Sequence, residues 1–222
     1  MNGPSPLWFA ARGLGMVLLL TLTATVVLGI VTGRRWSARD WPRFVTAELH
    51  RNLSLLAVVL LGLHGASVLL DTYTGLGLRD VLIPFDTAYR PLWLGLGVLA
   101  GELLVALVVV SLLRVRLGYG LWRFTHWAAY AAWPLALLHG LGTGSDTRFG
   151  WALLLYAGCA GAALTAVLVR LLLHRQASSS RLLAGLLVGV AALSVAVWTM
   201  LGPLQPGWAA AAGTPPNLLG GP

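Results

Sequence analysis

Apolar residues run through this chain in long stretches, which are separated by short segments of charge, glycine and proline. A helix needs about 20 residues to cross the hydrocarbon layer of a membrane, and six of these stretches are long enough. The predicted spans are residues 8–32, 46–70, 91–113, 121–142, 149–173 and 182–203. The pattern predicts an all-α polytopic membrane protein, folded as a six-transmembrane-helix bundle.

Composition agrees with a membrane protein and excludes several kinds of site. Hydrophobic residues make up 58% of the 222 positions, and charged residues only 10%. The single cysteine, Cys159, excludes an internal disulfide and any iron–sulfur cluster held by several cysteines. The net charge of +8 comes from arginines that cluster at the ends of the predicted spans, as membrane topology requires. We therefore expect a lipid bilayer around this protein and no nucleic-acid partner.

The arginines also predict an orientation. The first, third and fifth connections between spans hold 10 arginines, and the second and fourth hold 3. Positively charged connections stay in the cytoplasm, so we expect a multi-pass protein of the cell membrane with both termini external. Residues 1–203 would form one transmembrane domain. Residues 204–222 are uncharged and rich in proline, glycine and alanine, which predicts a disordered external tail.

Four of the five histidines lie in the second and fourth spans. His50 and His64 are 14 residues apart, which on a helix gives about 40° in azimuth and about 21 Å along the axis. His126 and His139 are 13 residues apart, about 140° on a straight helix. Pro134 lies between them, and a proline kink would bring His139 back toward the partner helix. Both helices run in the same direction, so the histidines match in depth as an inner and an outer pair.

Pairs of neutral imidazoles on facing helices suit the axial ligation of heme iron. Other roles remain open at this point. Each histidine would also satisfy a hydrogen bond to a neighbouring helix and fix the packing. The runner-up is a non-redox membrane protein, such as a small transporter or a scaffold, whose histidines relay protons or bind a transition metal. That alternative is weaker because no carboxylate or cysteine stands beside the histidines in sequence.

The histidine spacing, H-x13-H on one helix and H-x12-H two helices later, is similar to the ferric reductase-like transmembrane domain. This domain is shared by ferric reductases and by the membrane part of NADPH oxidases, and the resemblance covers about residues 10–200. It implies two b-type hemes. The inner heme would lie between His50 and His126, and the outer heme between His64 and His139.

Three arginines are candidates to pair with heme propionates. Arg51 and Arg123 are next to the inner histidines, and Arg12 interrupts the first span near its outer end. Ordinary positive-inside arginines would occupy the first two positions equally well. Glu102, midway along the third span, must be protonated or paired if it is buried.

The resemblance implies a di-heme electron-transfer protein that passes electrons from a cytoplasmic or membrane donor to an external acceptor. The larger family members continue into flavin and nicotinamide domains, whereas this sequence ends after its sixth span. Its longest predicted loop, residues 71–90, is far too short for such a domain. We therefore expect an oxidoreductase component that lacks its own flavin domain, and a separate flavin-containing reductase or other donor as partner.

Overall fold

The computed structural model describes residues 4–33, 42–172 and 178–219. Within these ranges the chain is helical and contains no strand. The long helices are α1 (Pro6–Gly33), α2 (Arg43–Leu70), α4 (Pro91–Leu112), α8 (Gly150–Leu172) and α9 (Ser178–Leu201). The shorter ones are α3 (Leu78–Leu82), α5 (Arg114–Leu117), α6 (Tyr119–His126), α7 (Ala129–Thr143), η1 (Ser145–Arg148), α10 (Trp208–Ala211) and η2 (Pro216–Leu218). The predicted all-α class is confirmed.

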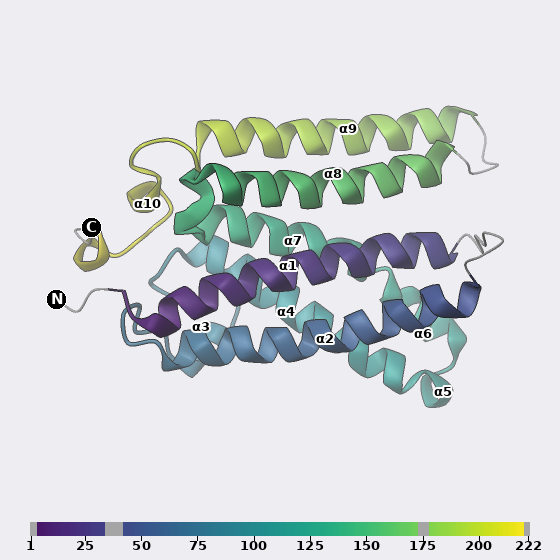
Figure 1. The fold of residues 1–222 in the computed structure, drawn as a ribbon, viewed down its shortest axis with the longest axis horizontal. Helices are drawn as coiled ribbons and strands as arrows, with labels where there is room; N and C mark the ends of the chain where they lie inside the picture. Colours follow the sequence, from purple (N-terminus) through teal and green to yellow (C-terminus); the bar gives the residue numbers. More distant parts are fainter. Residues whose placement is uncertain (1–3, 34–41, 173–177, 220–222) are drawn as a thin grey trace.

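The long helices lie roughly parallel to one another and form a bundle (Figure 1). The described ends of the chain lie at the same end of this bundle, with α10 beside the C-terminus. Large apolar side chains such as Phe9, Leu154 and Leu186 are exposed, as a surface that faces lipid requires. The chain is therefore a multi-pass membrane protein.

Helix α1 joins the two halves of the bundle, because it contributes to both clusters of buried apolar side chains. Leu19 of α1 packs with Leu137 of α7 and with Cys159 of α8. One residue earlier, Leu18 packs with Ala57 of α2 and Leu104 of α4. Helices α2 and α7, which carry three of the four histidines, thus both pack against α1.

Within the described residues, five helices are long and apolar enough to cross a membrane: Pro6–Val31, Phe44–Leu70, Pro91–Leu112, Gly150–Leu172 and Ser179–Leu201. The fourth predicted span, residues 121–142, is not one of them. It is divided into α6 and α7 by a turn at residues 127–128. Pro134 lies inside α7, after this turn, and its ring has no N–H to donate to the carbonyl of Tyr130.

The predicted disorder of the tail also differs from the structure. Residues 204–219 contain α10 and η2, and they are tied to the end of the bundle from which α4 starts. Arg90 donates its backbone N–H to the carbonyl of Gly213 and its Nε to the hydroxyl of Thr214. Trp208 donates its indole N–H to the carbonyl of Gly142, which also accepts from Arg90. Composition did not predict this order because it depends on these few hydrogen bonds.

Two connections that carried the orientation argument fall largely outside the described residues. Residues 34–41 include three of the four arginines of the first connection, and residues 173–177 include Arg175 of the fifth. The orientation therefore stays a prediction.

Candidate functional site

The four histidines of α2, α6 and α7 come together as two pairs. The imidazole centroids of His50 and His126 are 6.2 Å apart, and the rings are inclined at 63°. The centroids of His64 and His139 are 6.3 Å apart, with the rings at 84°. These are the pairs expected from the directions of the two histidine-bearing segments. The near-equal separations give the two sites the same basic geometry at two levels of the bundle.

A local tightening of the helix between His126 and His139 explains how these histidines, 13 residues apart, face His50 and His64, which are 14 residues apart. The backbone N–H groups of residues 127, 128, 130 and 131 each bond to the carbonyl three residues earlier, as in a 3₁₀-helix. Such a helix turns about 20° more and rises about 0.5 Å more per residue than an α-helix. Four such residues leave His126 and His139 about 60° apart and about 21 to 22 Å apart in height. The corresponding values for His50 and His64 are about 40° and 21 Å.

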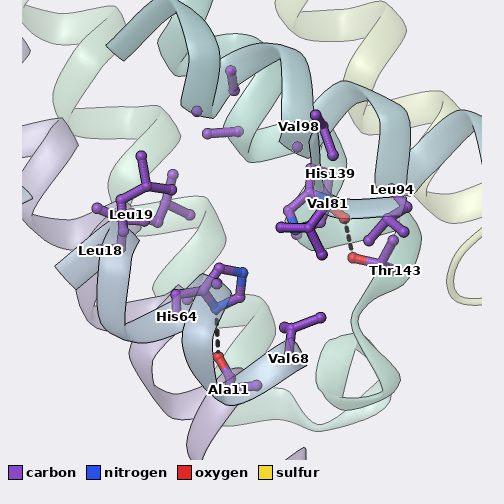
Figure 2. A pocket seen from close by; sticks show the side chains of 18 of the residues that line it. Ala11, Leu18, Leu19, His64, Val68, Val81, Leu94, Val98, His139 and Thr143 are labelled. Atoms are coloured by element: carbon purple, nitrogen blue, oxygen red, sulfur yellow. Dashed lines mark hydrogen bonds between the residues drawn. The ribbon is translucent and has the colours of Figure 1, made fainter. Parts of the chain in front are cut away.

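Three of the four imidazoles donate from Nδ1 to a backbone carbonyl on a neighbouring helix. His50 bonds to Thr25, His64 to Ala11 and His139 to Trp93, each with a nitrogen-to-oxygen distance of 2.9 Å. A carbonyl only accepts, so Nδ1 must carry the proton and Nε2 must be the basic nitrogen. Figure 2 shows His64 with one nitrogen bonded to Ala11 and the other on the opposite side of the ring.

His126 is held differently. Its Nδ1 is the one buried side-chain nitrogen or oxygen of the described residues that has no hydrogen-bond partner. The ring stacks on Trp122, with centroids 5.0 Å apart and planes at 28°. Trp122 is in turn fixed by a hydrogen bond from its indole N–H to Ser111. The inner pair therefore has one histidine bonded to a carbonyl and one held by stacking.

A cavity of about 680 Å³ adjoins the outer pair and is lined by both His64 and His139 (Figure 2). Its wall is mostly aliphatic and is formed mainly by α1, α2, α4 and α7. It reaches from Asp71, at the end of α2, to Val109 on α4. Its volume is within the usual range for a cofactor or ligand site of a protein.

Charged groups gather where this cavity approaches the external end that the sequence predicts. Arg12 forms an ion pair with Asp146 and lies with its guanidinium 3.9 Å from the ring centroid of Trp8. Asp71 accepts hydrogen bonds from the hydroxyls of Ser5 and Thr74. Burial of the Asp71 carboxylate opposes its ionisation, but these hydrogen bonds, together with those from the backbone N–H groups of Thr74 and Tyr73, outweigh that effect and lower its pKa below the ordinary value.

The other candidate residues lie in less enclosed places. Arg51 is 68% exposed and is 3.8 Å from Glu48, one helical turn away on α2. Arg123 is also exposed. Glu102 of α4 belongs to the wall of the 680 Å³ cavity but is itself exposed. Of the three arginines singled out from the sequence, the structure brings only Arg12 to the cavity beside a histidine pair.

Each histidine pair offers only two ligands, which suits a metal that is already coordinated by a cofactor. Among the described residues, no three His, Cys, Asp or Glu side chains form a cluster that would hold a bare metal ion. A metal bound between two imidazoles, with each ligand nitrogen about 2 Å away, sets the ring centres about 6 Å apart. The two histidine pairs have this separation, so their residues fit an iron porphyrin bound through two axial histidines.

Some residues of the site were missed by sequence reasoning. Asp146 and Asp71 looked like ordinary loop carboxylates, and nothing in their local sequence indicates their partners. Ser5 and Asp71 are 66 residues apart and Arg12 and Asp146 are 134 apart, so these contacts depend on the packing of distant segments.

Comparison with known protein families shows a match. The sequence model of the family described as "Ferric reductase like transmembrane component" matches residues 10–137, which is more than half of the chain. The match includes His50, His64 and His126 and ends two residues before His139. No curated protein and no solved structure matches the chain.

Proposed function

Because this chain belongs to the ferric reductase-like transmembrane family, we propose that it is a di-heme b-type electron-transfer protein of the membrane. The observation that carries the proposal is the pair of histidine sites, with ring centroids 6.2 and 6.3 Å apart at two levels of one bundle. If the histidines only fixed the packing of helices, their Nδ1 hydrogen bonds would be explained. The nearly equal separation of the two rings in both pairs would not be.

In this proposal, His50 and His126 hold the inner heme and His64 and His139 the outer one. When bound, the two hemes would supply one-electron oxidation and reduction. The protein provides the Nε2 ligands and fixes their tautomer through Nδ1. Most of the wall of the outer cavity is aliphatic and gives the outer heme apolar surroundings. Arg12 is the residue best placed to neutralise an outer propionate, and Arg51 and Arg123 remain candidates at the inner end.

We further propose that electrons enter at the cytoplasmic end and leave at the external end, with α6 and α7 together acting as a sixth membrane crossing. We propose a flavin-containing reductase as the donor, in keeping with the family; the described connections between helices are themselves far shorter than a nucleotide-binding domain. The acceptor would meet the protein near the mouth of the outer cavity. The protein is then one component of an oxidoreductase.

Visible spectroscopy of the purified protein tests the proposal. Protein expressed in heme-replete cells should be red, should change its spectrum on dithionite reduction, and should contain about two hemes per chain. Acidic organic solvent should release them, because the single Cys159 cannot form a C-x-x-C-H attachment site. Joint replacement of all four histidines by alanine is the control and should give colourless protein. A colourless wild type that gains no heme when heme is added would overturn the proposal.

A further inference from the structure

The three carbonyls that accept from histidines share one local feature, which is a glycine four residues later on the same helix. Ala11 precedes Gly15, Thr25 precedes Gly29, and Trp93 precedes Gly97. In an α-helix the carbonyl of residue i already accepts from the N–H of residue i+4. The carbonyl oxygen has a second lone pair that can accept another hydrogen bond. A side chain from a neighbouring helix reaches this lone pair by passing close to residue i+4, where a Cβ would clash with it.

At each of these three glycines, an added Cβ would crowd the histidine ring. A Cβ at Gly15 would lie 3.3 Å from Cε1 of His64, and one at Gly29 would lie 3.2 Å from Cε1 of His50. Both distances are shorter than ordinary van der Waals contact. A Cβ at Gly97 would be only 2.6 Å from Cγ of His139 and closer still to its Nδ1. By contrast, a Cβ at Gly13 would meet nothing within 4 Å.

We propose that Gly15, Gly29 and Gly97 are positioning residues for the heme ligands. By omitting a Cβ, each lets one imidazole approach a helix closely enough to donate Nδ1–H to the carbonyl. That bond fixes the tautomer and orients Nε2 toward the second histidine of the pair. This inference rests on the proposed function, because it names residues that position the ligands of the same two heme sites. Mutation of the groups that hydrogen-bond to metal ligands typically lowers metal affinity about 10- to 100-fold.

The arrangement makes the two sites unequal. The outer pair has two such glycines, Gly15 for His64 and Gly97 for His139, and the inner pair has only Gly29 for His50. On α4, the residues 13 and 14 positions after Gly97 are Val110 and Ser111, and His126 has no acceptor for its Nδ1. The outer heme is therefore the one whose two ligands are both fixed by backbone carbonyls.

The test compares alanine substitutions at these glycines with Gly13→Ala in the full-length purified protein. Alanine favours helix more than glycine by about 1 kcal/mol, so a loss of heme cannot come from weakening of the helix itself. Heme content, retention of heme during titration with apomyoglobin, and the midpoint potential of each heme are measured. Gly15→Ala and Gly97→Ala should weaken retention of one and the same heme by about 10- to 100-fold, with Gly97→Ala the more severe. Gly29→Ala should affect the other heme.

Where the heme is retained, its midpoint potential should become more positive, because an imidazole that loses its Nδ1 acceptor is a less basic ligand to ferric iron. Gly13→Ala should behave as wild type in both respects. Two well-loaded hemes with wild-type potentials in Gly15→Ala and Gly29→Ala would overturn the inference while leaving the proposed function intact. A wild type that binds no heme would instead defeat the proposed function.

Discussion

His50, His64 and His139 each donate Nδ1–H to a backbone carbonyl, so Nε2 is the basic nitrogen of each ring even without a cofactor. The sequence predicted these histidines as candidates, and the helical rise together with the shared direction of the two spans predicted their matched depths. It did not predict their acceptors. A signal was present nonetheless: Gly15 and Gly29 on α1 repeat the spacing of 14 that separates His50 from His64 on α2. Only the antiparallel packing of α1 on α2 shows that the two repeats face each other.

At Asp71 the chemistry of one side chain predicts a response to pH. The hydrogen bonds from Ser5 and Thr74 stabilise the carboxylate, so its pKa in the folded protein lies below the ordinary 3.8. Its contribution to stability is complete above that value and is lost as the pH falls through the lower folded pKa. Lowering the pH from 6 to 3 should therefore reduce the thermal midpoint of the wild type more than that of Asp71→Asn, which cannot ionise. Equal decreases in thermal unfolding scans would contradict this.

At the scale of elements, the pattern of apolar residues predicted where helices lie but not where the fourth one breaks. Residues 121–142 are mostly apolar, with Arg123 and His126 near the start, and periodicity gives no sign of the turn at residues 127–128. Pro134 predicted a disturbance, and the structure places the tightened hydrogen bonds 3 to 7 residues before it. The tightening corrects both the azimuth and the height of His139, so the break has a role in aligning the outer pair.

Pro134→Ala tests the role of this break. If α6 and α7 then join as a regular helix, His139 turns away by about 80° and moves about 2 Å along the axis, and the outer heme should be lost. Inserting one alanine after Ala131 in the same variant gives the spacing of 14 found on α2, and it should restore the outer heme. Heme content of the two variants is the measurement. If Pro134→Ala keeps both hemes, or if the inserted alanine does not restore the outer heme, then Pro134 does not determine the orientation of His139.

The arginine distribution predicts the orientation of the whole bundle, and the proposed direction of electron flow depends on that orientation. Reporter fusions after Asp40 and after Arg175 should report a cytoplasmic position. Fusions after Asp80 and after Gly220 should report an external one, since an even number of crossings returns the chain to the side where it began. The reverse pattern would place the His64–His139 pair at the cytoplasmic side and invert the proposed route.

Heme analysis of four single variants tests the pairing of the histidines: His50→Ala, His64→Ala, His126→Ala and His139→Ala. Each variant is purified, its heme is counted, and the remaining heme is titrated with reductant. Because each iron needs its own axial pair, His64→Ala and His139→Ala should lose the same heme and keep the other. His50→Ala and His126→Ala should show the complementary loss. The proposed pairing is wrong if His50→Ala and His139→Ala remove the same heme, or if all four variants retain both.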